Sequence, residues 1–319
     1  MGAQTRPLTR ARRGSKQSGN FPRLSEFLQQ LLNGLSLGAI YALIALGYTM
    51  VYGVLRFINF AHSDVFMVGA FIGYYIGQHV PQNTVGGGLV VMLAAMLGCA
   101  LLGILIERLA YRPLRGAPTL NVLITAIGVS LLLEYSGQVF FGATPRTFPS
   151  VFPSVNFAFG SLVISSNQIV VIVVTALLMV GLQLIVYRTK IGTAMRAVSL
   201  NPKAAQLVGI NNDVVISFTF GLGSALAAAG GVLYALNYPS IDPLMGVMPG
   251  LKAFVAAILG GIGNIPGAAL GGLLLGTVET FVNGSQWSTY KDAIAFAILI
   301  IILLFRPAGL LGKASVEKV

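Results

Sequence analysis

The segment Asn59-Phe60-Ala61-His62-Ser63-Asp64 brings an amide, an imidazole, a hydroxyl and a carboxyl together between two hydrophobic runs. These groups can form hydrogen bonds, but a catalytic centre also needs a paired nucleophile and base or a set of metal ligands. The sequence has no Cys/His metal pattern, no G-x-S-x-G motif and no phosphate-binding G-x-x-x-x-G-K-[ST] motif. We therefore expect polar groups that line a site or a path, and we expect that the chain is not an enzyme.

Two interpretations of this segment remain open. It is either a capped turn at the membrane interface or a polar lining at membrane depth, where non-helical backbone must be covered by protein or wetted by a path. A second polar break, rich in glycine, follows an apolar stretch later in the chain. We predict that the two breaks line a substrate path formed by Asn59, His62, Ser63, Asp64, Gly260, Gly261, Gly263 and Asn264.

Ionisable residues inside apolar runs are costly and are therefore candidates for function. Glu134 lies within one run, Lys252 starts a broken apolar stretch, and Glu279 ends a later run. Both glutamates have either a structural hydrogen-bonding role or a role in the path, and we include Glu134 in the predicted path. Lys291 and Asp292 open the last run, where we expect them at the membrane interface.

The elements that position these residues must span a membrane. Of the 319 residues, 55% are hydrophobic and 9% are charged, against about 25% charged in soluble domains. Apolar runs near the bilayer-crossing length of about 20 residues exclude a β-barrel, whose strands alternate in polarity over about 10 residues. We predict an all-α integral membrane protein, a bundle of about eight transmembrane helices with one or two broken or re-entrant helices. The runs lie near 31–54, 60–78, 89–106, 119–141, 168–187, 214–236, 266–283 and 290–305, and the broken stretch covers 246–262.

The basic residues predict the orientation of the bundle. Lys and Arg number 20 against 9 Asp and Glu, and such an excess gathers in cytoplasmic loops. Segments 107–118 and 188–213 are basic and are predicted to be cytoplasmic, whereas 78–88 and 142–167 hold one arginine between them and are predicted to be external. Counting back from 78–88 puts the basic tail 1–26 outside. Either the tail is external despite its charge, or an early run does not cross fully.

The domain organisation follows from these runs. Residues 1–26 are expected to be a disordered tail, 27–311 the transmembrane domain, and 312–319 a C-terminal tail. Within the domain, two series of glycines at a spacing of four residues predict close helix contacts, because residues four apart share one helix face. These series are Gly69, Gly73 and Gly77, and Gly263, Gly267 and Gly271, with Gly272 and Gly276 alongside.

The segment 188–213 is the longest basic link and predicts a short surface helix. Asn201 and Pro202 are residue types preferred at the N-cap and first helical positions. Gly209 suits the C-terminal cap of a helix that runs from Pro202 to about Val208. Such a helix on the cytoplasmic face could dock a soluble partner, and the alternative is a solvated linker.

Three stretches resemble the permease subunits of ATP-binding-cassette (ABC) importers, in particular the LivH-type branched-chain amino acid permeases. They are NGLSLGAIYALIALGYTMVYGVLRFINFAHSD at 33–64, ERLAYRPLRGAP at 107–118, and GLKAFVAAILGGIGNIPGAALGGLLLGTVE at 250–279. The resemblance extends from about Phe27 to the C-terminus. Their order and combination are specific to the family, though not to one substrate.

The resemblance implies a multi-pass subunit in the inner membrane that works with a second permease subunit, two cytoplasmic ATPases and a periplasmic substrate-binding protein. ATP would be bound by the partner subunits, and no cofactor is expected in this chain. Permeases of such importers carry a coupling helix with an E-A-A-x-x-x-G-like pattern, which Lys203-Ala204-Ala205 and Gly209 match in spacing. The residues expected to couple to the ATPase are Arg196, Asn201, Lys203, Ala204, Ala205 and Gly209.

The sequence departs from the family at two positions that bear on function. Lys203 stands where the coupling pattern is acidic, and Ser63 stands where the family typically has glycine. Several alternatives remain open: the same architecture could import urea, short amides or another amino acid, and a stand-alone channel or ion-coupled carrier is also possible. An intramembrane enzyme is disfavoured, because no nucleophile–base or metal set is present.

Overall fold

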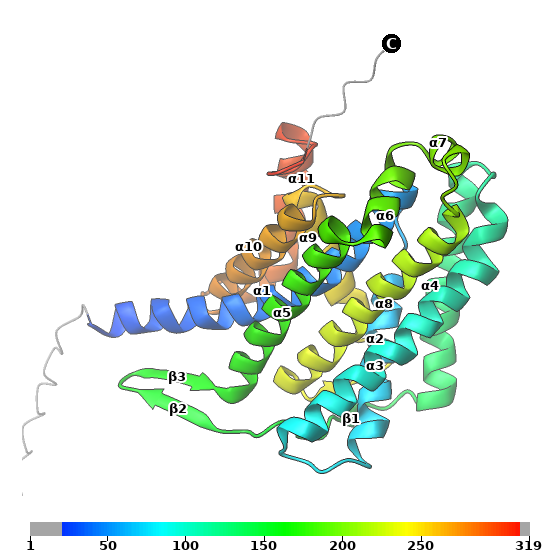
Figure 1. The fold of residues 1–319 in the computed structure, drawn as a ribbon. Helices are drawn as coiled ribbons and strands as arrows, with labels where there is room; N and C mark the ends of the chain where they lie inside the picture. The colour runs from blue at the N-terminus through cyan, green and yellow to red at the C-terminus, as the bar shows by residue number, and fades with distance from the viewer. Residues whose placement is uncertain (1–20, 313–319) are drawn as a thin grey trace, which may run out of the picture.

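The structure is a computed structural model that describes residues 21–312 (Figure 1). Helix α1 begins at Phe21, inside the predicted tail 1–26, and the rest of that tail and residues 313–319 lie outside the described residues. The helices are α1 (Phe21–Leu55), α2 (His62–Gly77), α3 (Val85–Ile106), α4 (Thr119–Phe141), α5 (Ser166–Arg188), α6 (Lys190–Leu200), α7 (Pro202–Leu207), α8 (Asn212–Asn237), α9 (Val247–Gly260), α10 (Ile265–Asn283) and α11 (Lys291–Phe305). The strands are β1 (Arg146–Thr147), β2 (Asn156–Phe159), β3 (Leu162–Ser165) and β4 (Ser240–Ile241).

Seven helices among the described residues are long and apolar enough to cross a membrane: α1, α3 with its continuation to Leu114, α4, α5, α8, α10, and α11 with the 3-10 turn before it. Helix α2 has 16 residues and α9 has 14, which is shorter than the roughly 20 residues of a full crossing. The predicted all-α polytopic bundle is confirmed. Helix α2 corresponds to the predicted run at 60–78, and α9 corresponds to the predicted broken stretch at 246–262.

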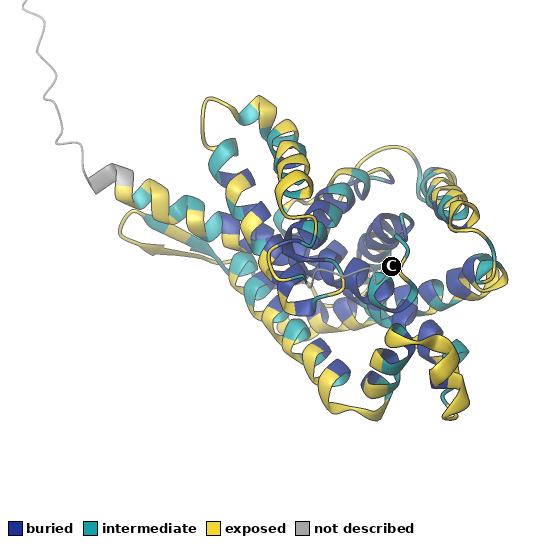
Figure 2. Ribbon diagram, turned by 90° about the horizontal axis from the view of Figure 1, so that it is seen from above, coloured by how far each residue is buried: buried dark blue, intermediate teal, exposed yellow. Residues whose placement is uncertain are grey.

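The bundle has a buried centre and an apolar outer shell. Helix α8 and the part of α1 from Gly34 onward are mostly buried, whereas α4, α5 and α11 expose rows of leucine, isoleucine and valine (Figure 2). A soluble protein would not leave so much apolar surface on three helices. Hydrocarbon chains of a bilayer match that surface, and the chain is therefore a multi-pass membrane protein.

The two ends of the bundle differ in charge. Helices α6 and α7, which carry Arg196 and Lys203, lie at the upper end in Figure 1. Arg115 lines a hollow together with Pro202 of α7, and we call this basic end the cytoplasmic end. The opposite, outer end carries the antiparallel pairs β1–β4 and β2–β3. The two segments predicted to be cytoplasmic, 107–118 and 188–213, thus share one end, and the strands of 142–167 lie at the other.

Helix α1 runs from the outer end to the cytoplasmic end. Near its start, the Gln29 side chain donates to the carbonyl of Val163 in β3 and accepts from its N–H, both over 2.9 Å. Near its end, Val54 and Leu55 line a groove together with residues of α7. The first helix therefore starts at the outer end and crosses the whole bundle. The early run that is too short for a full crossing is the next helix, α2.

Glycines allow the central helices to touch. A Cβ atom on Gly276 of α10 would lie 2.3 Å from the Cα of Gly38 in α1, and one on Gly69 of α2 would lie 2.5 Å from the Cα of Ala228 in α8. Both distances are too short for any side chain, so these glycines are contact points between helices. Gly263 is different: it lies in the turn between α9 and α10 with a positive φ of 91° and no neighbour within 4 Å of an added Cβ.

The break after α9 is a helix end covered by the C-terminal segment. Gly261 adopts a positive φ of 105°, which stops the helix. The carbonyls of Leu259 and Gly260, left without helical partners, accept hydrogen bonds from the N–H groups of Leu310 and Leu311 at 2.8 and 3.0 Å. The C-terminal segment thereby holds the turn at the cytoplasmic end.

Candidate functional site: an outer cavity, a closed centre and an inner groove

The turn between α1 and α2 lies inside the bundle. The side chains of Asn59, His62, Ser63 and Asp64 are each less than a tenth exposed. The hydroxyl of Tyr111, at the end of the π-helical turn Glu107–Tyr111, donates to Oδ1 of Asn59 over 2.6 Å. The segment is therefore not an interfacial turn. Its non-helical residues, 59–61, are largely covered by protein, as membrane depth requires, and His62, Ser63 and Asp64 form the first turn of α2.

Asp64 connects this turn to α4. Its Oδ2 accepts a hydrogen bond of 2.5 Å from the hydroxyl of Ser130. Glu134, one helical turn further along α4, is half-buried and close enough to interact electrostatically with the Asp64 carboxyl. The structure thus brings Glu134 together with the predicted residues of the turn.

A cavity of about 720 Å³ opens at the outer end, between α1, α5, α8, α9, α10 and α11. This volume is within the range of roughly 300–1,000 Å³ that is typical of small-molecule sites. Polar groups dominate its walls, including three tyrosines, several amides and four charged side chains. We call it the outer cavity.

Three charged side chains form the outer charge cluster in the wall of this cavity. The ammonium of Lys252 lies 2.5 Å from Oε1 of Glu279 and 2.6 Å from Oδ1 of Asp292. The hydroxyl of Tyr41 donates to the second oxygen of Glu279 over 2.9 Å. Lys252 and Glu279 are nearly fully buried, whereas Asp292 is 41% exposed. Lys291, the fourth charged residue of the wall, has no ion-pair partner among the described residues.

A second hollow of about 780 Å³ lies at the cytoplasmic end, and we call it the inner groove. Its walls come from the end of α1, the π-helical turn after α3, the start of α4, and the segment from α6 to α8. Asn201 and Pro202, at the start of α7, line it directly. The predicted coupling segment therefore borders a hollow that leads toward the buried turn.

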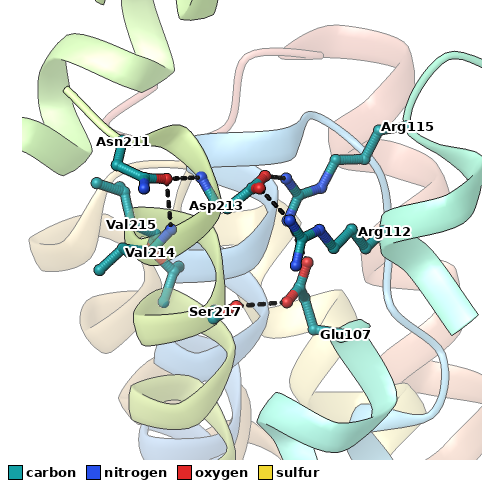
Figure 3. Close-up of polar contacts among 9 residues, drawn as sticks. Glu107, Arg112, Arg115, Asn211, Asp213, Val214, Val215 and Ser217 are labelled. Carbon is teal, nitrogen blue, oxygen red and sulfur yellow. Dashed lines mark hydrogen bonds and ion pairs between the residues drawn. The ribbon is translucent and has the colours of Figure 1, made fainter. Parts of the chain in front are cut away.

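The inner charge cluster beside this groove consists of Glu107, Arg112, Arg115 and Asp213 (Figure 3). Arg115 pairs with both Glu107 and Asp213, and Arg112 pairs with Asp213. Glu107 is fully buried, and its other oxygen accepts from the hydroxyl of Ser217 in α8 over 2.6 Å. The cluster therefore joins the end of α3 to the start of α8 by paired charges.

Buried side chains separate the two hollows. Tyr41 and Val54 of α1 line the outer cavity and the inner groove respectively, and Tyr48 lies between them along the helix. The Tyr48 ring packs on His62 at 4.7 Å and on Phe254 at 6.0 Å between centroids. None of these three rings lies in the wall of the outer cavity or of the inner groove, so they stand between the two hollows, and we call them the closed centre.

Helix α7 forms as its sequence predicts. Oδ1 of Asn201 accepts the N–H of Ala204 over 3.1 Å, so Asn201 is its N-cap, and Pro202 is its first residue. The helix ends at Leu207, and Gly209 follows with a positive φ of 87°. Lys203 is exposed on this helix, whereas Ala205 is buried.

Helix α6 was not predicted, although its sequence carries two signals. The hydroxyl of Thr189 accepts the N–H of Gly192 over 3.1 Å, which is an N-cap contact. Met195 and Val198 are buried on one face of the helix, at helical spacing. Arg196 lies on the exposed side and places its guanidinium over the Tyr187 ring at 5.5 Å.

The second predicted break does not join the first. Among the described residues, no hydrogen bond joins the turn Asn59–Asp64 to the turn Gly260–Asn264, and the small hollow that Gly263 lines has no residue of the first turn in its wall. The amide of Asn264 donates instead to the carbonyl of Leu311 over 2.6 Å. The outer charge cluster also contains Asp292, which the sequence indicated as an interfacial residue.

Comparison with known proteins agrees with this architecture. Residues 30–303 match the family described as "Branched-chain amino acid transport system / permease component". The chain is 45% identical to the high-affinity branched-chain amino acid transport system permease protein BraD of Pseudomonas aeruginosa, over 93% of this chain and 100% of that protein. It is 43% identical to the corresponding permease protein LivH of Escherichia coli, over 92% and 98%. It is 30% identical to a probable branched-chain amino acid transport permease protein of Methanocaldococcus jannaschii, over 86% and 89%.

Proposed function

The chain belongs to the family of permease components of branched-chain amino acid transport systems, and from this premise we propose that it carries leucine, isoleucine and valine across the inner membrane. The observation that supports this most directly is the identity with the bacterial permease proteins over nearly the whole of both chains. The residues that line the outer cavity and the inner groove all lie within the matched range 30–303. The chain acts as the transmembrane subunit of an ABC importer.

The importer needs partners that supply energy and substrate. Two cytoplasmic ATPase subunits bind ATP and dock on α7, a second permease subunit completes the membrane unit, and a periplasmic binding protein delivers the amino acid at the outer end. We expect the ATPase subunits to bind the nucleotide, because the sequence of this chain lacks a phosphate-binding loop. The fixed orientation of α7 beside the inner groove supports docking at the cytoplasmic end.

Movement of α7 reaches the closed centre through a short series of contacts. The Asn212 side chain at the start of α8 donates to the carbonyl of Pro202 in α7 over 2.9 Å. The next residue, Asp213, pairs with Arg115, 2.5 Å away, and Arg115 pairs with buried Glu107. The hydroxyl of Tyr111, in the same π-helical turn as Glu107, holds Asn59 of the buried turn. ATP-driven motion at α7 thus changes the packing around the centre and switches the open end.

The coupling role is tested by Gly209→Val. The positive φ of 87° at Gly209 is strained for a β-branched residue by about 1–2 kcal/mol, so the variant distorts the end of α7. We expect uptake of tritiated L-leucine to fall by about fivefold or more while the partner ATPases continue to hydrolyse ATP. Gly116→Val is the matched control, because Gly116 is also exposed with no neighbour within 4 Å but has no positive φ. Normal uptake by Gly209→Val at equal membrane abundance would contradict the coupling role.

The substrate is tested with a strain that lacks this chain. We expect loss of high-affinity uptake of L-leucine, L-isoleucine and L-valine, and recovery when the chain is restored with its partners. Loss of urea or short-amide uptake with unchanged leucine uptake would favour the alternative that the same architecture imports urea or short amides. Flux by the purified chain alone in vesicles, without ATPases, would favour a channel or carrier.

A further inference from the structure

The outer charge cluster has one ammonium group and two carboxylates, whereas a purely structural ion pair needs only one of each. Lys252 is shared between the carboxylates of Glu279 and Asp292, so these three residues carry one excess negative charge. Lys252 and Glu279 are buried and pair with each other, so the excess falls on Asp292, the more exposed carboxylate, where an incoming cation would balance it. Lys291 adds a positive charge elsewhere in the same wall and has no ion-pair partner in residues 21–312.

We propose that the outer cavity binds the zwitterionic head group of an α-amino acid. The Asp292 carboxylate receives the ligand's ammonium group, and the Lys291 ammonium receives its carboxylate. The cavity wall then presents a dipole that is complementary to a dipolar ligand, and the four charged side chains sum to zero as the ligand does. This inference rests on the proposed function and assigns a site in the chain where the substrate binds before it is transported.

The contacts within the cluster separate fixed groups from available ones. Glu279 uses one oxygen for Lys252 and the other for the Tyr41 hydroxyl, so it holds the cluster in place. Asp292 is the more exposed carboxylate and has one oxygen on Lys252, which leaves the other oxygen for a ligand. Its position at the start of α11 faces the same hollow as Lys291.

The remainder of the cavity suits an aliphatic side chain. Leu37, Met248 and Pro249 contribute apolar surface to an otherwise polar wall. A volume of about 720 Å³ accommodates a single amino acid with several water molecules, each of which occupies about 30 Å³ in the liquid. Tyr41, in the same wall, lies two helical turns before Tyr48 of the closed centre, so a ligand held here lies at the entrance to the path.

Direct binding of tritiated L-leucine to the purified full chain in detergent tests this inference. We expect saturable binding that weakens by about tenfold or more in Asp292→Asn and in Lys291→Gln, the effect of losing one charged hydrogen bond. Asp242→Asn is the matched control, because Asp242 lies at the outer end outside the cavity wall, and its carboxylate accepts the N–H of Leu244 over 2.8 Å. We expect its binding to equal that of the unmodified chain.

Two unlabelled analogues test the ligand class. 4-Methylpentanoate lacks the ammonium group of leucine, and 3-methylbutylamine lacks its carboxylate. Each should compete at least about tenfold more weakly than unlabelled L-leucine, because each leaves one charged side chain without its partner. Equal competition by either analogue would overturn the zwitterion assignment.

The outcomes for the cavity and for the transporter are separable. Absence of saturable binding, or unchanged binding in both variants, would overturn the cavity assignment even if leucine uptake by cells depends on the chain. In the opposite case, the purified chain shows charge-dependent binding of L-leucine, but cells that lack the chain still take up leucine. That result would support the amino-acid site and contradict the proposed function. Because Asp292 is 41% exposed, Asp292→Asn is expected to fold, and a monodisperse elution profile checks this.

Discussion

The two charge clusters of this chain lie at opposite ends of the bundle and differ in balance. The inner charge cluster has two guanidinium groups and two carboxylates, and every carboxylate is paired with an arginine. The outer charge cluster has one ammonium between two carboxylates, in the wall of a 720 Å³ cavity. A balanced network stabilises the joint between two helices, whereas the outer cluster leaves one partly exposed carboxylate in the wall of a cavity, where a ligand could reach it.

The surroundings of each cluster strengthen this contrast. Glu107 is fully buried and hydrogen-bonded to Ser217, so the inner cluster has a solvent-free anchor in α8. Asp292 remains 41% exposed to the outer cavity. The inner cluster is therefore expected to govern stability and coupling, and the outer cluster is expected to govern binding.

The largest expected difference between the clusters is in stability. Glu107→Ala leaves the Ser217 hydroxyl without its acceptor and Arg115 with Asp213 alone, and the loss of these buried contacts costs about 2 kcal/mol. Asp292→Ala removes a partly exposed group while Lys252 keeps Glu279, and its expected cost is below about 1 kcal/mol. Denaturation of the purified variants in detergent compares the two.

Two results would revise this comparison. Equal stability of Glu107→Ala and the unmodified chain would remove the structural role of the inner cluster. A loss of stability in Asp292→Ala as large as that in Glu107→Ala would show that the outer cluster holds the helices together, which would leave less reason to assign it to a ligand.

The helices could be predicted because each crossing is a local property of the sequence. The run expected at 119–141 is α4 with the same bounds, and the run expected at 214–236 is α8 (Asn212–Asn237). The cap residues of α7 were predicted for the same reason, since Asn201 bonds within its own first turn. Apolar length and capping act over a few residues and are readable without the fold.

The outer charge cluster could not be assembled from the sequence, because its members lie far apart in the chain. Lys252 and Glu279 are separated by 27 residues, and each is isolated in its own apolar run. Asp292 was expected at the interface, and only the packing of α11 beside α9 shows that it reaches Lys252. Polar residues on separate helices meet through tertiary packing, which no local pattern encodes.

A second prediction separates coupling from binding. Asp213→Asn weakens the pairs with Arg112 and Arg115 and so interrupts the contacts between α7 and Glu107. We expect the maximal rate of L-leucine uptake to fall about fivefold, near the lower end of typical coupling energies, with unchanged binding of L-leucine to the purified chain. Asp292→Asn should instead weaken the binding of L-leucine to the purified chain. Weakened leucine binding in Asp213→Asn would contradict the division of roles between the two clusters.

The smallest expected effect concerns the N-cap of α7. Asn201→Ala removes the acceptor for the N–H of Ala204 and destabilises this short helix by about 1 kcal/mol. We expect leucine uptake to fall by less than about fivefold, because helix α7 frays locally while the inner charge cluster stays paired. Uptake measured at equal membrane abundance checks this.

Asn201→Asp is the matched variant for this last prediction, because aspartate retains a capping oxygen at the same position. It should restore uptake to the level of the unmodified chain, whereas Asn156→Ala, on the exposed outer strand β2, should have no effect. If Asn201→Asp fails like Asn201→Ala, the amide of Asn201 itself contacts the ATPase. The sensitivity of the cytoplasmic end would then come from recognition of the partner and not from the stability of α7.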